Sequence, residues 1–161
     1  MTVDVEPARP ADLPEAVAVI HRAFATLADR IDPPSSAMTE TVDTLAARVE
    51  RGGRVFIARR QDGLILGAVC AAPKPDGSVY MDRLAVDPSA CGQGIARALT
   101  DAVEDFARAD GLGPITVGVR LRLPDNIALF RHLGYVETGR KAHPGFAEPT
   151  SMDLAKAIGR P

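Results

Sequence analysis

The sequence predicts a mixed α/β domain in which a central, mostly antiparallel sheet of six to seven strands is covered by about four helices. Three observations point to this fold class. Apolar residues recur at helical spacing in four segments, follow strand patterns in seven others, and two Asp-Gly pairs separate the three central strands. The chain has 161 residues and is 46% hydrophobic, so we expect residues 1–161 to form a single domain.

A short strand and two helices are expected in the N-terminal third. Residues 3–5 alternate between valine and a polar residue until prolines interrupt the pattern. Asp12, followed three residues later by Glu15, predicts a capped start for a helix over residues 13–24. A second helix is expected over residues 42–49, because its apolar positions have helical spacing and two glycines follow it.

The middle of the chain changes to strand patterns. Runs rich in β-branched and other apolar residues occupy residues 55–58, 64–70 and 79–86. Asp62-Gly63 and Asp76-Gly77 separate these runs, and Asp-Gly pairs favour tight hairpin turns. We therefore expect a three-stranded antiparallel meander.

The C-terminal half alternates helices and strands. Residues 95–107 carry the clearest amphipathic pattern of the chain, and glycines end it. A strand over 115–119 and a short helix over 126–132 follow, and two further strands are expected at 136–140 and 151–154.

Composition excludes several classes of function. The chain has 19 Lys and Arg against 21 Asp and Glu, giving a net charge of −2, and only 4% aromatic residues. A nucleic-acid-binding domain is usually basic and offers aromatic rings for stacking, so nucleic acid is not expected as a partner. The two cysteines, Cys70 and Cys91, and the three histidines lack metal-ligand spacing, so we expect no disulfide and no metal.

The expected location in the cell is inferred from the lack of a secretory or membrane-spanning pattern. The first thirty residues contain Asp4, Glu6, Asp12 and Glu15 and have no basic start followed by an apolar run, so no secretory signal is expected. No apolar stretch approaches the roughly 18 residues that a transmembrane helix needs. We expect a cytoplasmic protein without a membrane partner, and a homodimer remains open.

The segment between the strand at 79–86 and the helix at 95–107 predicts an anion site. Glycines at 92 and 94 let the backbone approach a ligand closely, and a helix start offers free N–H groups and a positive dipole end. A phosphate ester is the expected ligand. The alternative is a glycine turn that binds nothing.

Two common phosphate ligands do not fit this loop. A dinucleotide fingerprint needs Gly or Ala where Arg97 stands, and an acidic residue after the strand at 115–119. A nucleoside triphosphate loop needs Gly-Lys followed by Ser or Thr, whereas this chain has Gly94-Ile95-Ala96. NAD, FAD, ATP and GTP are therefore disfavoured.

The loop resembles the signature of the GNAT superfamily of acyl-CoA-dependent N-acyltransferases. That signature is Arg or Gln, two residues, Gly, one residue, then Gly or Ala, and here Cys91-Gly92-Gln93-Gly94-Ile95-Ala96 stands in its place. The preceding Leu84-Ala85-Val86 and the later segment from Asn126 to Gly134-Tyr135 also match, and the order of elements agrees over nearly the whole chain. The resemblance implies a GNAT-like fold, acetyl-CoA as co-substrate, and an amine of a small molecule or peptide as acceptor.

The resemblance also implies where coenzyme A binds. Its pyrophosphate would lie on the amides of residues 92–97, and two backbone groups of the preceding strand would bond the pantetheine arm. The residues expected to bind the cofactor are Leu84, Ala85, Val86, Cys91, Gly92, Gln93, Gly94, Ile95, Ala96, Arg97, Asn126 and Phe130. Two of these depart from the pattern. Cys91 replaces an Arg or Gln, and Phe130 stands where many members carry a tyrosine that protonates the departing thiolate, which phenylalanine cannot do.

Three residues are candidates for catalysis. Strand alternation is expected to place Tyr80 and Asp82 on the same side as Leu84. Asp82 would accept the proton of the amine, directly or through water, with a structural ion pair as the alternative. Tyr80 is either a catalytic phenol or a packed aromatic residue. His143, in an irregular stretch before the last strand, has a suitable intrinsic pKa or is a surface histidine without a task.

The predicted function is the acetyl-CoA-dependent transfer of an acetyl group to a primary amine by direct attack. The alternative is a CoA-binding sensor or interaction module with little catalysis. A covalent route through Cys91 is less expected, because that residue belongs to the glycine loop. Arg120 and Arg122 either recognise an acidic acceptor, bind a phosphate of coenzyme A, or are simply solvated. A longer acyl chain and the identity of the acceptor stay open.

Overall fold

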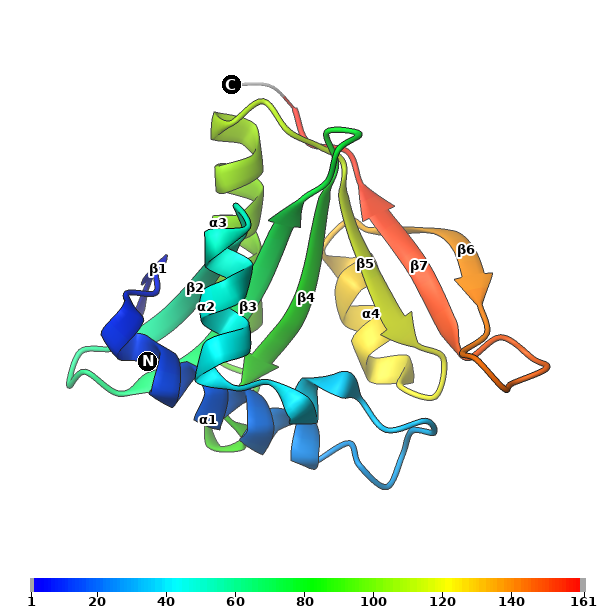
Figure 1. Ribbon diagram of the computed structural model, residues 1–161, viewed down its shortest axis with the longest axis horizontal. Coiled ribbons are helices and arrows are strands. Elements are labelled where there is room, and N and C mark those ends of the chain that lie inside the picture. Colours follow the sequence, from blue (N-terminus) through cyan, green and yellow to red (C-terminus); the bar gives the residue numbers. More distant parts are fainter. Residues whose placement is uncertain (1, 160–161) are drawn as a thin grey trace.

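Seven strands and four α-helices form within residues 2–159, the part of the chain that the computed structural model describes (Figure 1). Along the chain these elements are β1 (Val3–Pro7), α1 (Leu13–Ala25), α2 (Val42–Glu50), β2 (Arg54–Arg60), β3 (Ile65–Pro73), β4 (Val79–Val86), α3 (Ile95–Ala109), β5 (Ile115–Arg120), α4 (Pro124–His132), β6 (Val136–Lys141) and β7 (Ser151–Lys156). Short 3-10 turns, including η2 (Ser36–Thr39), join some of them. The predicted fold class is confirmed.

The strands form one sheet in the order β1-β2-β3-β4-β5-β7-β6. All neighbouring strands are antiparallel except β4 and β5, and the predicted meander is β2, β3 and β4. The parallel pair is short, because only Val79 pairs with Ile115 and Tyr80 with Thr116. Beyond these pairs β4 and β5 diverge and leave a V-shaped opening toward the lower end of the view in Figure 1.

Helices cover both faces of the sheet and create two cores. On one face α3 buries a stripe at intervals of four residues, and Leu99, Val103 and Ala107 are fully buried there. On the other face α1 packs through residues such as Ile20, and α2 through Leu45, both also fully buried. The helical spacing seen in the sequence thus corresponds to real core-facing stripes.

Gly67 of β3 sets how closely α3 approaches the sheet. A Cβ atom at this position would lie 2.9 Å from side-chain carbons of Ile95 and of Leu99. At such a distance a larger residue would force these two side chains to shift. The absence of a side chain at Gly67 therefore leaves room for the first turns of α3 to pack closely on β3.

The expected cap of the first helix was wrong. Asp12 does not cap α1; its carboxylate accepts hydrogen bonds from the backbone N–H of Arg9 and from the guanidinium of Arg59. These bonds, the one from Arg9 first, lower the pKa of Asp12 below its usual value. Glu15 instead accepts the backbone N–H of Ile65 at 2.6 Å. Both carboxylates serve contacts between distant segments, which a local spacing rule cannot detect.

Strands β3 and β4 change register once along their length. Ala68 pairs with Ala85, whereas Cys70 pairs with Asp82. Residues 83–84 of β4 therefore lie opposite a single residue of β3, which defines a β-bulge. The bulge lies at the point where β4 has already separated from β5.

The bulge corrects one prediction about the site. Arg83 adopts a φ of 57°, and after it the side chains of β4 exchange faces. Leu84 packs with the core under α3, while Asp82 lies on the opposite face, toward α1 and α2. Tyr80 and Asp82 do not share a side with Leu84, because strict alternation does not continue through a bulge.

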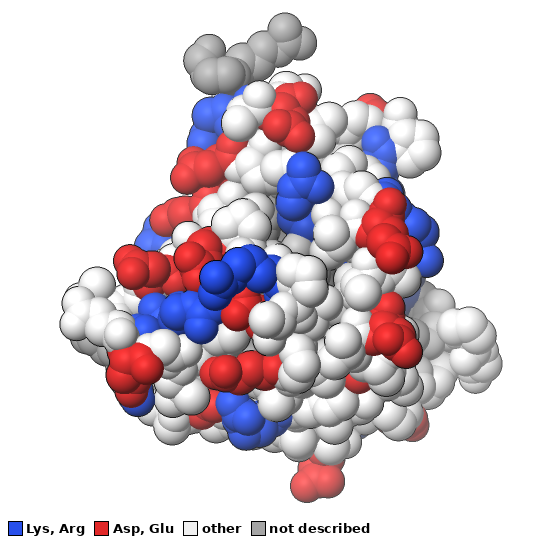
Figure 2. All heavy atoms as spheres, turned by 60° about the vertical axis from the view of Figure 1, so that its left-hand side comes forward, with Lys and Arg blue, Asp and Glu red and all other residues white. Residues whose placement is uncertain are grey.

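One face of the molecule carries interspersed charges of both signs. On the face seen in Figure 2, Lys and Arg side chains alternate with Asp and Glu and form no broad patch of one sign. Among the helices of the described residues, none is long and apolar enough to cross a membrane.

Candidate active site

A cavity of about 610 Å³, here called the loop cavity, opens in front of the N-terminus of α3. The helix has no side-chain cap and no acidic residue in its first turn, and Gly94 occupies the N-cap position. The first N–H groups of α3 and the positive end of its dipole therefore face this cavity. An anion placed there would meet free backbone donors and the positive end of the dipole, so anion binding at this helix start stays a prediction.

Two glycines leave room for a ligand beside the helix start. Gly92 and Gly94 have φ values of +79° and +81°, a region that residues with a side chain rarely adopt. A Cβ atom built on either would meet nothing within 4 Å, so the space next to the backbone is open. A phosphate group can approach the amides there without contact with a side chain.

Most residues predicted to bind the cofactor line the loop cavity. These are Leu84, Val86, Cys91, Gly92, Gly94, Ile95, Ala96, Arg97, Asn126 and Phe130. Ala85 does not line it, because the bulge turns this side chain into the core under α1. Gln93 is exposed and also lies outside the lining.

A second cavity of about 560 Å³, here called the strand cavity, occupies the opening between β4 and β5. The end of α1, the turn η2 and the loop between β6 and β7 complete its walls. The two cavities share five lining residues: Phe24, Leu27, Leu84, Asn126 and Phe130. The loop cavity and the strand cavity therefore meet beside the bulge of β4.

Phe130 of α4 lies at this junction. It is buried and packs edge-to-face against Tyr135, with ring centroids 5.5 Å apart. Tyr135 itself donates to Glu104 at 3.3 Å and does not line either cavity. The hydroxyl of Tyr135 therefore cannot replace the proton donor that Phe130 lacks.

Asp82 is held in an ion pair. Its two carboxylate oxygens lie 3.1 and 3.2 Å from the guanidinium nitrogens of Arg48. Arg48 also contacts the buried Glu40 at 2.7 Å, and Glu40 in turn accepts from Arg83 at 3.0 Å. Asp82 thus forms the structural ion pair that the sequence analysis gave as the alternative to a role as a base. The sequence did not indicate this network, because Arg48 looks like a surface residue of an amphipathic helix.

Tyr80 lies with its hydroxyl toward β5. A Cβ atom at Gly118 would be 3.5 Å from this hydroxyl, and the ammonium of Lys74 lies 5.5 Å from the ring centroid. Burial, together with the charge of Asp82, raises the pKa of Tyr80 above its usual value. The phenol is therefore protonated at neutral pH.

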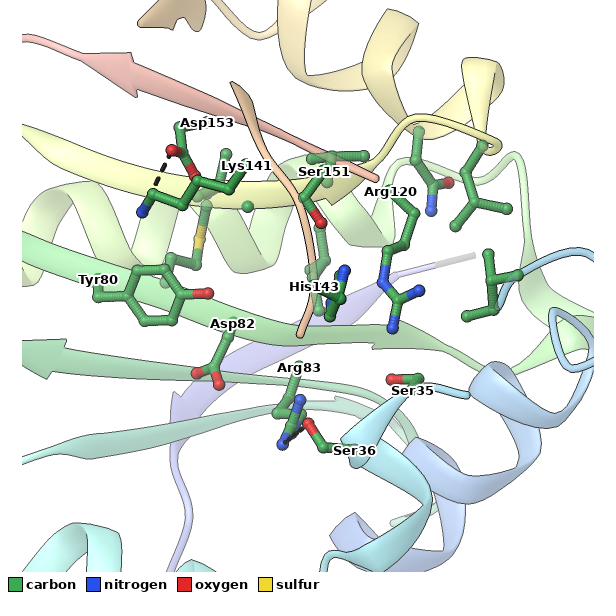
Figure 3. A pocket seen from close by; sticks show the side chains of 18 of the residues that line it. Ser35, Ser36, Tyr80, Asp82, Arg83, Arg120, Lys141, His143, Ser151 and Asp153 are labelled. Atoms are coloured by element: carbon green, nitrogen blue, oxygen red, sulfur yellow. Dashed lines mark hydrogen bonds and ion pairs between the residues drawn. The ribbon is translucent and has the colours of Figure 1, made fainter. Parts of the chain in front are cut away.

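His143 projects into the strand cavity from the loop between β6 and β7 (Figure 3). Its backbone N–H donates to the hydroxyl of Thr150, and its Nδ1 also contacts that hydroxyl. No described residue bonds the other ring nitrogen, Nε2. Burial, and then the positive charge of Arg120, lower the pKa of His143 below its usual value. The ring is therefore neutral at neutral pH.

Two further charged groups were not predicted at the site. Lys141 and Asp153, at the end of β6 and on β7, form an ion pair at 3.2 Å beside the strand cavity. Residue spacing does not indicate their proximity, because it depends on the pairing of β6 with β7. Arg120 lines the same cavity, whereas Arg122 is exposed and lines neither.

The cysteines are separate and differ in environment. Both are free; Cys70 is buried, and burial raises the pKa of its thiol to about 12. Cys91 is exposed beside the loop cavity, and its thiol contacts the backbone oxygen of Asp87 at 3.6 Å. Within residues 2–159 no three His, Cys, Asp or Glu side chains lie close enough to hold a metal ion.

Comparison with known proteins agrees with this geometry. The model of the Acetyltransferase (GNAT) family matches residues 22–135, which are 114 of the 161 residues. An IAA acetyltransferase of Azospirillum brasilense is 30% identical over 104 residues, covering 64% of this chain and 67% of that protein. N-acetyltransferase 8 of Mus musculus is 29% identical over 106 residues, covering 63% of this chain and 47% of that protein, so the chain spans about half the length of this relative.

Solved structures share the fold over almost the full length. A phosphinothricin acetyltransferase from Sinorhizobium meliloti in complex with AcCoA has a TM-score of 0.78 at 21% identity, covering 99% of this chain and 90% of that chain. The ribosomal-protein-S18-alanine N-acetyltransferase of Escherichia coli has a TM-score of 0.78 at 21% identity, covering 99% and 96%. At these identities the similarity shows a common fold.

Proposed function

The chain belongs to the GNAT family of acetyltransferases, and from this premise we propose that it transfers the acetyl group of acetyl-CoA directly to an amine of a small molecule or peptide. The junction of the two cavities carries this proposal. The loop cavity suits an anionic ligand at the N-terminus of α3, and the strand cavity offers proton-transfer groups. A thioester that extends from one and an amine in the other would meet beside Phe130.

The residues at the helix start fit the pyrophosphate of coenzyme A. The amides from Gly92 to Arg97 would hold it, and the open space beside Gly94 leaves room for it. Beyond Tyr80, the backbone groups of β4 that face β5 have no strand partner. Those near Leu84 are therefore available to the pantetheine arm and to the carbonyl oxygen of the thioester.

The reaction needs a proton acceptor for the amine. Acetyl-CoA supplies the thioester: a C–N bond forms at the acetyl carbon, the C–S bond breaks, and the amine nitrogen loses a proton. We assign this proton to Nε2 of His143. For this role we assign the tautomer in which the hydroxyl of Thr150 donates to the backbone oxygen of Lys141, 3.4 Å away, and accepts from Nδ1–H. This tautomer leaves the lone pair on Nε2.

Asp82 is the weaker candidate for this step. Both of its oxygens are engaged by Arg48, so Asp82 would have to give up part of a bidentate ion pair to accept a proton. The neutral ring of His143 accepts a proton without the loss of an ion pair. Asp82 would then hold Arg48 and the adjoining β4 backbone in position.

The thiolate of coenzyme A must also gain a proton. Phe130 carries no donor, so we assign this role to the phenol of Tyr80, which lines the strand cavity and stays protonated at neutral pH. The names of the relatives refer to different acceptors, an alanine of a ribosomal protein and phosphinothricin among them. Those names therefore do not identify the amine that this chain uses.

Ligand-dependent thermal unfolding tests the cofactor assignment. Coenzyme A and acetyl-CoA at about 100 times their Kd should raise the Tm by roughly 5–10 °C, because they bind only the native state. NAD and ATP should leave the Tm unchanged, since the loop lacks the features that either requires. Stabilisation by NAD or ATP, with none by coenzyme A, would contradict the assignment.

A further inference from the structure

The strand cavity carries more basic than acidic groups. The charged residues that line it are Lys74, Arg83, Arg120, Lys141, Asp82 and Asp153. Both aspartates already have partners: Asp82 is paired with Arg48, and Asp153 is paired with Lys141. Neither carboxylate is free to attract a cationic ligand.

The basic residues differ in what neutralises them. Arg83 is paired with the buried Glu40 at 3.0 Å. Lys74 is exposed, and its ammonium lies over the ring of Tyr80. Among the described residues, no carboxylate lies within 4.0 Å of either Lys74 or Arg120. Of these two cations, Arg120 is the one that is partly buried.

The guanidinium of Arg120 points into the strand cavity near His143 (Figure 3). Its only described hydrogen bond goes to the backbone oxygen of Pro34, at 3.4 Å. Asp32 acts on it only at longer range. Burial lowers the pKa of Arg120, but an arginine keeps its charge at any physiological pH. The cavity thus contains a permanent cation whose donors are mostly unused.

A role in cofactor binding does not explain this residue. Arg120 lines the strand cavity and does not line the loop cavity, where the helix start offers the phosphate site. A partly buried guanidinium without a carboxylate costs free energy unless a ligand supplies the anion. Two parallel N–H groups of arginine match the two oxygens of a carboxylate.

We propose that Arg120 binds a carboxylate of the acceptor, so that the substrate is a small, amino-acid-like molecule that carries both an amine and a carboxylate. This inference rests on the proposed function and specifies its acceptor class. A volume of about 560 Å³ suits a small molecule. Polyamines and lysine-rich peptides are disfavoured, because Arg120 and Lys74 would repel them.

The same charges assist the chemistry of the acceptor. A cation near a bound ammonium disfavours its charged form and lowers its pKa. Arg120 would therefore help the amine to lose its proton to His143, while its bond to the carboxylate keeps the acceptor in the cavity. Binding and activation thus act on two ends of one molecule.

Matched pairs of acceptors test the proposal. Each L-α-amino acid, and each straight-chain ω-amino acid of increasing length, is compared with its carboxamide. The preferred amino acid should exceed its amide in kcat/KM by roughly 10- to 100-fold, the scale of hydrogen bonds to a charged group. The amide has the less basic amine and hence more of the reactive free form, so intrinsic reactivity would favour the opposite order.

Variants of Arg120 assign this preference to the residue. Arg120→Gln should remove it by lowering kcat/KM much more for the amino acid than for the amide, and Arg120→Lys should retain part of it. Arg122→Gln is the matched control: it removes the same charge from an exposed neighbour and should preserve the preference. Thermal unfolding confirms that each variant folds.

Several results would overturn the proposal: equal losses for acid and amide in Arg120→Gln, a wild-type preference for amides or polyamines, or a preference for acidic peptides over free amino acids.

A binding experiment tests the role of Arg120 without turnover. Calorimetry measures the binding of propionate to the complex of the protein with coenzyme A. Propionate should bind the wild type and not Arg120→Gln. Absence of any amine turnover would contradict the proposed function, whereas absence of propionate binding would contradict the role of Arg120.

Discussion

Gly94→Val should weaken the binding of coenzyme A by at least about 100-fold, because several charged hydrogen bonds to the pyrophosphate would be lost together. The residue stands at the N-cap of α3 with a φ of +81°, and the space beside it is open in the described structure. A branched side chain would fill that space and strain the backbone. Isothermal titration calorimetry with coenzyme A measures the loss.

Two controls separate the blocked site from general damage. Gly111→Val, at the other end of α3, imposes a similar strain at a φ of +67° with nothing within 4 Å, and should leave the affinity unchanged. Cys91→Ala should have only a small effect, because position 91 already lacks the arginine or glutamine of the family signature. Equal losses in Gly94→Val and Gly111→Val would indicate general damage to α3, and an unchanged affinity in Gly94→Val would mean that the phosphate binds elsewhere.

His143→Ala should lower kcat/KM by roughly 10²–10⁴-fold, the usual scale of general acid–base catalysis, and should leave the affinity for coenzyme A nearly unchanged. Asp82→Asn should change kcat/KM by less than about 10-fold, because an ion-paired carboxylate is not the proton acceptor in this account. Steady-state kinetics on both variants decides between these two residues.

The dependence of the rate on pH gives an independent check. The pKa of His143 is lowered from 6.5, and the neutral ring is the active form, so kcat/KM should rise with pH through a value below 6.5 and be level at neutral pH. His143→Ala should lose this rise, and Arg120→Gln should move it to higher pH by removing a positive charge. A large loss in Asp82→Asn, together with an unchanged profile in His143→Ala, would make Asp82 the base.

The features that sequence predicted well depend on neighbouring residues. The stripe of α3 and the glycines at 92 and 94 are local patterns, and each fixes its own backbone geometry and burial. The structure therefore shows the expected glycine loop and uncapped helix start, while the binding of an anion there stays a prediction. Tight turns at the two Asp-Gly pairs specified the meander for the same reason.

Other features depend on contacts between distant segments and could not be predicted. The bulge at residues 83–84 follows from the pairing of β4 with β3, and it reversed the expected orientation of Asp82 relative to Leu84. The partner of Asp82 is Arg48, which lies 34 residues away along the chain. Arg120 looked like a solvated strand end in the sequence, and only the fold brings its side chain into a cavity.

The most direct test of the account is a product analysis after incubation of the purified chain with acetyl-CoA that carries an isotope-labelled acetyl group and a mixture of amino acids, amino amides and diamines. Mass spectrometry of the mixture and a thiol assay follow the two products of the same reaction. We expect labelled acetyl on the nitrogen of an amino acid, with one free thiol released for each acetyl group transferred. Binding of coenzyme A without any labelled N-acetyl product would contradict direct transfer to an amine at the junction of the two cavities.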